Sequence, residues 1–580
     1  MIHQAMQAFQ SGNLNSAEII LKRVLAAHTK NLPALHILGL IKASQSKHKE
    51  AAELLKRAIR LSPVDSSLHY NLAKALQESG ADKESLPHHK KAIELNPANL
   101  EAWLNYGRSL SRIGLNSDAL NVYTKSLQIN PNYIEALVNI GATLKDLQRY
   151  DEALNYADKT IAINPNFSEA WSNRGIALKE LKRYDEALSS YDKAISLKPE
   201  YHEAYSNRGV TLNELKRYDE ALSSYDKAIS LKPDYHEAYS NRGVTLNELK
   251  RYDEALSSYD KAISLKPDYF DAHWNRSLTQ LVTNNFDNGW KNYEYRWKKN
   301  KSESMHHQQF PLLTNLSEIS GKSVLIWSEQ GYGDTIQFSR FIEKLIELKA
   351  NVIFEVQEPL KALFENSFVH PKIISQGEPT GDIDFQLPLL SLPLLFAIDI
   401  SNIPSATSYI QDAKENSVLW RHKLNLTNKK INIGIACSGN EKHLNDKNRS
   451  MDLRFFEPIA DQANLFLIQK DLKASDQDFL YKRPDIKFLG DEIKSFNDSA
   501  SIIQAMDLVI TVDTSLAHLS GALGKPTIIL LPWNPEWRWL LDRQDSPWYP
   551  MVKLFRQPNL GNWEAIIKEV SLHLSLNYQR

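Results

Sequence analysis

The stretch SEQGYGDTIQF, residues 328–338, contains residues whose types and spacing could do chemistry. Asp334 follows a turn bracketed by Gly331 and Gly333, and that turn follows a short apolar run at 324–327. A glycine turn between a strand and a helix often binds phosphate, but the carboxylate of Asp334 would repel one. We therefore expect Asp334 to accept a proton from a substrate; the alternative is that it only caps the helix that follows.

Two nucleotide-binding motifs do not fit this turn. A Walker loop requires GxxxxGK[ST], which does not occur in the required context. The dinucleotide fingerprint requires a third glycine, where this sequence has Ile336. Glu355, at the end of the next strand, could bind a ribose, yet Asp334 would still face the pyrophosphate. The turn is therefore better suited to proton transfer than to phosphate binding.

Two further polar loops follow apolar runs later in the chain. The run at 506–512 leads into Asp513, Thr514 and Ser515, and the N–H groups of the helix that starts there could bind a diphosphate. The alternative is that one of these side chains is an ordinary helix cap. A second loop, 437–454, gathers four basic residues behind a glycine turn; it is either a solvated loop or an anion site. These residues are Lys442, Lys447, Arg449 and Arg454.

The elements that must position these loops begin at residue 322. Short apolar runs at 322–327, 350–356, 430–437, 464–469, 506–512 and 526–531 predict strands, with weaker strands at 372–375 and 383–387. Helical patterns follow at 335–348, 358–366, 515–523 and 562–576. Such alternation predicts two doubly wound α/β halves, 322–425 and 426–580. Ligands bind at the carboxyl ends of parallel strands, so the three loops would converge on one cleft if the halves face each other.

The first 300 residues repeat with a period of 34. Prolines recur at 63, 97, 131, 165, 199, 233 and 267, and residues 201–234 and 235–268 are identical. Apolar residues at helical spacing within each unit predict stacked helix pairs, nine in all with the irregular ends, because one unit cannot bury its apolar face alone. This pattern resembles the tetratricopeptide repeat. We expect a solenoid over 1–300 and a polar connector over 301–321.

Asparagines recur at one position on the first helix of successive units. In tetratricopeptide superhelices the first helices line the concave groove, so these amides could bind an extended peptide backbone without reading its side chains. The alternative is that they tie neighbouring helices together. The residues of this asparagine ladder are Asn71, Asn105, Asn139, Asn173, Asn207, Asn241 and Asn275.

Composition excludes several classes of function. A formal net charge of −1 argues against a nucleic-acid partner, and no apolar run is long enough to span a membrane. The single cysteine, Cys437, fits a reducing compartment, and we expect a cytoplasmic protein. The adjacent His306 and His307 lack further ligands nearby, and the Asp-x-Asp strings at 382–384 and 476–478 arise easily by chance, so we expect no metal site.

Four motifs in order resemble glycosyltransferase family 9, the family of bacterial lipopolysaccharide heptosyltransferases, in its tetratricopeptide-linked branch. They are EQGYGDTIQF, SGNEKHLNDKNRS, MDLVITVDTSLAHLSGALGKP and WRWLLDRQDSPWYP, and the resemblance extends from about residue 322 to 563. It implies a GT-B fold of two Rossmann-like halves and an inverting reaction without a metal or other cofactor, with a nucleotide-diphosphate sugar as co-substrate. Asp334 aligns with the general base. The residues expected at the donor are Gly331, Gly333, Ser438, Lys447, Arg449, Asp513, Thr514, Ser515, Leu516 and His518.

The combined prediction is a glycosyltransferase, hexosyl- or heptosyl-transferring, whose solenoid recruits a protein, a peptide or another acceptor. One alternative is a binding scaffold with a catalytically inactive GT-B domain, and another is a GT-B-fold sugar epimerase. Five of the twelve tryptophans fall in 533–563, interleaved with Arg538, Arg543 and Arg556; part of this cluster must be core, and Trp533 or Trp537 could stack on a base or a sugar.

Overall fold

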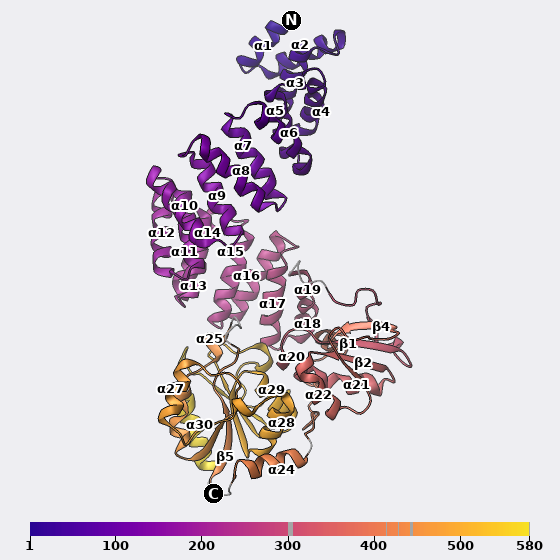
Figure 1. Cartoon of the computed structure of the whole chain (residues 1–580), viewed down its shortest axis with the longest axis vertical. Coiled ribbons are helices and arrows are strands. Elements are labelled where there is room, and N and C mark those ends of the chain that lie inside the picture. Colours follow the sequence, from indigo (N-terminus) through magenta and orange to yellow (C-terminus); the bar gives the residue numbers. More distant parts are fainter. Residues whose placement is uncertain (300–304, 413, 427–428, 441–444, 579–580) are drawn as a thin grey trace. The chain divides into compact units, whose positions relative to one another are not determined.

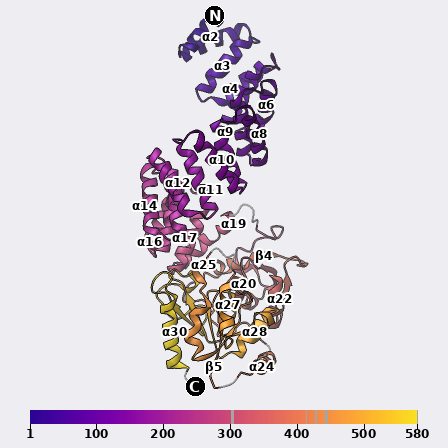
Figure 2. The same ribbon diagram turned by 60° about the vertical axis from the view of Figure 1, so that its left-hand side comes forward.

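The computed structural model describes residues 1–299, 305–412, 414–426, 429–440 and 445–578. The chain forms two compact units, Met1–Asp234 and Tyr235–Arg580 (Figure 1; Figure 2). Each unit has its own interior and is described by itself below. Among the described residues, every helix is too short or too polar to cross a bilayer.

The first unit consists of antiparallel helix pairs, as the 34-residue period predicts. Consecutive helices contact each other both within a pair and between successive pairs. The helices are α1 (Ile2–Gln10), α2 (Leu14–Ala27), α3 (Leu32–Ser44), α4 (His48–Ile59), α5 (Ser66–Glu78), α6 (Asp82–Leu95), α7 (Leu100–Arg112), α8 (Asn116–Ile129), α9 (Ile134–Asp146), α10 (Tyr150–Ile163), α11 (Ser168–Glu180), α12 (Tyr184–Leu197), α13 (His202–Glu214) and α14 (Tyr218–Leu231).

A glycine on the first helix of a pair allows a tyrosine on the second helix to pack against it. A Cβ atom built on Gly209 would lie 2.7 Å from the ring of Tyr225, which is closer than real contacts allow. Gly141 has Ala157 at the corresponding position, and a Cβ there would have its nearest neighbour at 3.9 Å. The repeated glycine is therefore required by the size of its partner.

The second unit begins with the last two helix pairs and a short helix. These are α15 (His236–Glu248), α16 (Tyr252–Leu265), α17 (Phe270–Val282), α18 (Phe286–Tyr293) and α19 (Arg296–Lys299). Residues 1–299 are all described, so the nine predicted helix pairs are confirmed within that range.

The first α/β half contains a four-stranded, wholly parallel sheet. Its order is β3-β2-β1-β4, formed by β1 (Ser323–Trp327), β2 (Asn351–Val356), β3 (Lys372–Ser375) and β4 (Phe385–Pro388). The helices and 3-10 turns of this half, and the linking helix that follows, are η1 (Leu316–Glu318), α20 (Tyr332–Phe338), η2 (Ser339–Phe341), α21 (Ile342–Glu347), α22 (Glu358–Ser367), η3 (Leu389–Ser391), α23 (Leu392–Leu395) and α24 (Lys414–Lys423).

The second half contains a six-stranded parallel sheet with the order β10-β9-β8-β5-β6-β7. Its strands are β5 (Ile431–Ala436), β6 (Ala463–Leu467), β7 (Lys487–Phe488), β8 (Leu508–Val512), β9 (Thr527–Leu531) and β10 (Val552–Arg556). Its helices are α25 (Asp446–Arg449), η4 (Leu453–Phe456), α26 (Glu457–Ala460), α27 (Ala474–Lys482), η5 (Gly490–Glu492), α28 (Phe496–Ala505), α29 (Ser515–Ala522), η6 (Trp537–Trp539) and α30 (Trp563–Asn577). Counted from β5 as the first strand, this is the doubly wound order 3-2-1-4-5-6.

The expected architecture, a helical solenoid followed by two Rossmann-like halves, is confirmed. One predicted helix differs in detail: 335–348 begins at Tyr332 and is interrupted by η2 before α21. One continuous apolar core joins the last repeats to both halves, and it includes Trp290, Phe338, Trp537 and Trp548. The last repeats are therefore part of the same interior as the two sheets.

Candidate functional site

The turn after β1 carries Asp334 at the start of α20. Gln330 adopts the left-handed conformation, with φ 61°, and Gly331 is the N-cap. The Gly331 N–H donates a hydrogen bond of 2.9 Å to Oδ2 of Asp334. Asp334 therefore does cap the helix, as the plain interpretation holds, but this contact uses only one of its two oxygens.

The second oxygen of Asp334 faces an arginine that is 204 residues away in the sequence. Nη2 of Arg538 forms an ion pair with Oδ1 of Asp334, while Nη1 pairs with Glu536. The Nε–H of Arg538 donates to Oε1 of Gln337 at 2.5 Å, and the guanidinium lies over the ring of Trp537, 4.4 Å from its centroid. Burial raises the pKa of Glu536 to about 7. Asp334, Arg538 and Glu536 thus form one ion-pair network.

The other two predicted loops lie at the topological switch point of the second sheet. Strand order reverses between β5 and β8, and parallel α/β sheets bind ligands at such a point, outside the carboxyl ends of the strands. Ser438 follows β5, and Asp513 follows β8. The Nη1–H of Arg449 donates to the backbone oxygen of Asp513 at 3.1 Å and so joins the two loops. A Cβ on Gly439 would lie 2.7 Å from Nη2 of Arg449, which places the guanidinium directly on the glycine turn.

Two groups at this switch point carry N–H donors without a hydrogen-bond partner among the described residues. Thr514 is the N-cap of α29, and no side chain accepts from the first turn of that helix among the described residues. Nε of Arg449 is buried without a hydrogen-bond partner in the described part of the chain, and the nearest carboxylate oxygen, Oδ1 of Asp446, is 3.7 Å away. Unpaired N–H groups at a helix N-terminus together with a guanidinium are well suited to a diphosphate.

The two halves meet where α20 packs on α29. A Cβ on Gly333 would lie 2.8 Å from Cδ2 of His518 and 3.4 Å from Cα of Ser515, so only glycine allows this approach. The structure therefore brings the turn that carries Asp334 next to the loop that carries Asp513.

The remaining predicted donor residues occupy different environments. His518 is buried; its Nδ1 is 2.9 Å from the Tyr549 hydroxyl and its ring stacks on Trp539. Burial lowers the pKa of His518 well below its usual range. Lys447 is exposed, and Leu516 packs against the core at the junction of the halves. Lys442 lies outside the described residues.

Burial also raises the pKa of Asp513. Ser438 accepts a hydrogen bond of 3.0 Å from Nε2 of Gln469.

The two tryptophans that could stack on a ligand have partners within the protein. Trp537 packs against Trp290, and the ammonium group of Lys250 lies over the ring of Trp533, 3.6 Å from its centroid. Both tryptophan rings therefore contact protein groups. In the described parts of the chain, no three His, Cys, Asp or Glu side chains gather as a metal site would require.

A second charged network fixes the turn from the solenoid side. Arg296 of α19 binds Glu329 through two hydrogen bonds of 2.8 Å, Nε to Oε2 and Nη2 to Oε1. Both side chains are buried, with 6% and 7% of their surface exposed. Nη2 of Arg296 also donates to Oγ of Ser391 at 2.7 Å, and the Tyr293 hydroxyl is 3.2 Å from Nε2 of Gln330. The last repeat therefore holds the residues directly before Gly331.

Sequence reasoning missed both Arg538 and Arg296. The interleaving of arginine with tryptophan at 533–563 could have indicated Arg538, because an arginine among buried aromatic residues needs a buried anion as its partner. The sequence contained no comparable signal for the Arg296–Glu329 pair, because it depends on how the last repeat meets the first sheet.

The asparagine ladder is half-buried throughout. The amide of Asn71 is 2.9 Å from Nε2 of His36, and that of Asn105 donates to the Tyr70 hydroxyl at 3.3 Å, each one repeat earlier. At these two positions the amide ties neighbouring helices together. Nδ2 of Asn139 is buried without a partner among the described residues.

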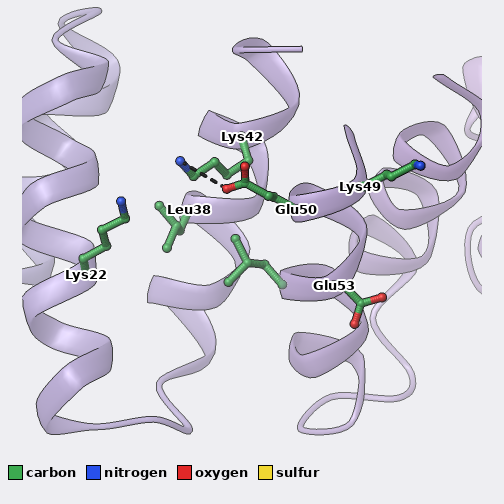
Figure 3. A pocket seen from close by; sticks show the side chains of 7 residues that line it. Lys22, Leu38, Lys42, Lys49, Glu50 and Glu53 are labelled. Atoms are coloured by element: carbon green, nitrogen blue, oxygen red, sulfur yellow. Dashed lines mark ion pairs between the residues drawn. The ribbon is translucent and has the colours of Figure 1, made fainter. Parts of the chain in front are cut away.

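The first unit also contains a shallow hollow among α2, α3 and α4 (Figure 3). The ammonium group of Lys42 lies over Leu38 and pairs with Glu50 at 3.5 Å and with Glu18 at 2.7 Å. Hydrogen bonds from Lys22 and Lys42 lower the pKa of Glu18 to about 2. The buried charge in this hollow is thus neutralised within the protein.

Comparison with known proteins gives matches in both parts of the chain. Tetratricopeptide repeat models match residues 32–65, 100–133, 134–164, 168–201, 202–235 and 236–269. The model "Glycosyltransferase family 9 (heptosyltransferase)" matches residues 494–539, which include β8, α29 and Arg538.

One curated relative and two solved structures illustrate the similarity. Protein FlbA of Caulobacter vibrioides is 22% identical over 310 residues, which cover 49% of this chain and 52% of that protein, so the chain spans about half the length of this relative. A tetratricopeptide repeat protein from Parabacteroides merdae is 23% identical with a TM-score of 0.40, covering 43% of this chain and 98% of that one. A thermophilic tetratricopeptide repeat protein of Thermus thermophilus is 25% identical with a TM-score of 0.30, covering 31% and 99%. The chain therefore contains tetratricopeptide repeats within residues 32–269 and a segment, 494–539, that matches the glycosyltransferase family 9 model.

Proposed function

We propose that the chain is an inverting, metal-independent glycosyltransferase that uses a nucleotide-diphosphate sugar. The observation that carries this proposal is the switch point of the second sheet. There the uncapped N-terminus of α29 and the buried Nε of Arg449 lie next to the turn that carries Asp334. An anion-binding site beside a carboxylate is what transfer from a sugar diphosphate requires.

Each group has a defined part in such a reaction. The acceptor oxygen attacks the anomeric carbon as Asp334 takes its proton, a contribution of about 10²–10⁴-fold in rate. The bond from that carbon to the diphosphate oxygen breaks on the opposite face, so the configuration inverts. The departing negative charge is stabilised by the N–H groups at Ser515 and Leu516 and by Arg449, with Lys447 close by in the same loop.

Arg538 fixes the orientation of Asp334, because its Nη2 forms an ion pair with Oδ1 of that carboxylate. The other end of the same guanidinium pairs with Glu536. One arginine therefore holds both carboxylates in place.

The solenoid would recruit the acceptor. Ladder asparagines such as Asn173, Asn207, Asn241 and Asn275 form no side-chain hydrogen bond to the described residues, in contrast to Asn71 and Asn105. Amides with free donors and acceptors can bind a peptide backbone. We therefore assign peptide binding to the later repeats and a helix-tying role to Asn71 and Asn105.

A screen of the purified protein against a panel of nucleotide sugars, read by the mass of the released nucleotide, tests the proposal. Arg449→Met should weaken the thermal stabilisation by the matching nucleoside diphosphate. Arg454→Met is the matched control, because Arg454 lies in the same loop but pairs with Asp452 at the surface. Equal effects of the two changes would contradict the assignment of the anion site.

A second candidate is a scaffold whose transferase domain is inactive. It is favoured by the fact that both oxygens of Asp334 are already bound, one by Gly331 and one by Arg538. In that case no nucleotide would raise the melting temperature, and no nucleotide sugar would be consumed.

A further inference from the structure

Tyr293, the last residue of α18, occupies the repeat position of Tyr259, which lies 34 residues earlier. A Cβ on Gly243 would lie 2.6 Å from the ring of Tyr259, so glycine is what lets that ring pack on the first helix of its pair. The last repeat has Ser277 in place of this glycine. Because serine carries a Cβ, the close packing of Tyr259 is not available to Tyr293.

The ring of Tyr293 packs instead among aromatic side chains of the core. It is 2% exposed, and its centroid lies 4.8 Å from that of Trp274 and 6.3 Å from that of Trp537. The guanidinium of Arg296 lies over the same ring, 5.0 Å from its centroid. The position of the ring is therefore fixed by packing, independently of its hydroxyl group.

The hydroxyl of Tyr293 reaches the turn that precedes α20. Nε2 of Gln330 donates a hydrogen bond of 3.2 Å to this hydroxyl. Nε2 of Gln357, the residue after β2, donates to the backbone oxygen of Gln330 at 3.3 Å. Gln330 is thus held at its side chain by the last repeat and at its backbone by the first sheet.

Gln330 needs such contacts because its backbone conformation is unfavourable. Its φ of 61° lies in the left-handed region, which residues other than glycine rarely populate. Strained conformations of this kind persist only where the surrounding structure holds them from several sides. Loss of the contact with Tyr293 should therefore allow the turn to relax.

The backbone of Gln330 is directly coupled to Asp334. The peptide unit between Gln330 and Gly331 is planar, so the orientation of the Gly331 N–H follows that of the Gln330 carbonyl group. This N–H donates the 2.9 Å hydrogen bond to Oδ2 of Asp334. A rotation of the backbone at Gln330 would turn the N–H away and release one of the two oxygens by which Asp334 is held.

We propose that Tyr293 is a positioning residue of the transferase: its hydroxyl keeps Gln330 in the left-handed conformation and so keeps Asp334 oriented towards the acceptor. The inference rests on the proposed function. It gives the last repeat a part in the reaction that is separate from recruiting the acceptor. Burial raises the pKa of Tyr293, so its hydroxyl keeps its own proton, and the proton of the acceptor passes to Asp334.

Tyr293→Phe removes the hydroxyl and keeps the packed ring. For the nucleotide sugar that the wild-type protein consumes, the kcat of nucleotide release should fall about tenfold, because Asp334 is no longer held in position. The KM for that donor and the stabilisation by its nucleoside diphosphate should stay unchanged, because the anion site belongs to the second half. Tyr259→Phe is the matched control and should leave kcat unchanged, because Tyr259 has the same repeat position but packs on Gly243. Equal kcat values for the two variants would overturn the assignment.

Glycine at residue 330 tests whether Tyr293 acts through the turn. Glycine adopts positive φ about as readily as negative φ, so the turn of Gln330→Gly does not depend on the tyrosine hydroxyl. Tyr293→Phe added to Gln330→Gly should therefore slow nucleotide release by less than about twofold. A tenfold loss in this background as well would overturn the proposal, because the hydroxyl would then act elsewhere.

Hydrogen exchange provides a measurement that does not depend on turnover. The amides of residues 328–335 should exchange about fivefold faster in Tyr293→Phe, as expected for the loss of one hydrogen bond, and at the wild-type rate in Tyr259→Phe. A wild-type protein that consumes no nucleotide sugar would overturn the proposed function and the role of Tyr293 in it. Consumption of the donor together with equal exchange in the two variants would overturn this inference alone.

Discussion

Replacing Arg296 by methionine should destabilise the second unit strongly, although the same change at Arg217 should be silent. Both arginines bind a glutamate through two hydrogen bonds, Arg296 to Glu329 at 2.8 Å and Arg217 to Glu220 at 2.6 and 2.7 Å. The side chains of the first pair are 6% and 7% exposed, whereas those of the second are 44% and 49% exposed. The two pairs therefore differ in burial, and Arg296 also donates to Glu294 and Ser391.

The expected loss follows from what methionine leaves behind. Glu329 would keep the N–H of Leu390, at 3.1 Å, but would lose both bonds to the guanidinium. Removing one partner of a buried ion pair costs about 3–5 kcal/mol, because the other charge remains buried and unpaired. The exposed Arg217 is solvated in both states, and its replacement should leave the unfolding midpoint unchanged within error.

The stability lost in Arg296→Met should depend on pH, because it involves the pKa of Glu329. Burial raises the pKa of Glu329 in the folded protein, and Arg296 opposes that rise. Without Arg296 the folded carboxyl holds its proton more tightly than the unfolded one, so raising the pH favours unfolding. The deficit of Arg296→Met should therefore be larger at pH 8 than at pH 5, and Glu329→Gln added to it should recover part of the loss.

Urea unfolding measures these differences, followed by tryptophan fluorescence for Arg296→Met and by circular dichroism for Arg217→Met, which lies in the first unit. All of the twelve tryptophans except Trp103 and Trp171 follow residue 235, so the signal reports mainly on the second unit. Equal midpoints for Arg296→Met and Arg217→Met would refute the reasoning. So would a loss that is independent of pH and not relieved by Glu329→Gln.

Two further predictions concern close packing and a buried histidine. Gly209→Ala should destabilise the first unit by about 1–3 kcal/mol, because its Cβ would clash with a tyrosine ring. Gly141→Ala should instead stabilise that unit by about 0.5–1 kcal/mol, because a Cβ there meets no close neighbour and alanine favours a helix. Urea unfolding followed by circular dichroism compares the two variants, and equal effects would contradict the packing argument. Burial lowers the pKa of His518, so the unfolded chain takes up a proton that the folded chain cannot, and stability should fall as the pH drops from 7 to 5. His518→Gln should lose less stability over that interval in the same urea assay, and an unchanged pH dependence would rule out this contribution.

The sequence predicted the elements whose patterns are local. The 34-residue period specifies the helix pairs, because each unit repeats the same apolar spacing and the same small residues. The strands that precede the three loops, β1, β5 and β8, are apolar runs that stop at polar residues, and the loops begin near residues 328, 437 and 513. The sequence could therefore place these loops at strand ends, whereas the reversal of strand order between β5 and β8 is known only from the structure.

The sequence did not predict the partners of the charged residues. Arg538 and Asp334 are brought together only when α20 and η6 pack into one core, and nothing in the local sequence encodes that contact. The sequence reading also missed the break at η2 and the edge strand β10.

The most direct measurement of the central claim is the rate of nucleoside diphosphate release by Asp334→Asn. An asparagine side-chain oxygen at residue 334 can still accept the Gly331 N–H, and Arg538 keeps its pair with Glu536. The variant should therefore fold and bind nucleotide, but a neutral amide cannot accept a proton at this position. We expect the rate of sugar transfer to fall by about 10²–10⁴-fold while the stabilisation by nucleoside diphosphate is retained. A folded Asp334→Asn protein that transfers sugar at the wild-type rate would contradict the assignment of Asp334 as the base.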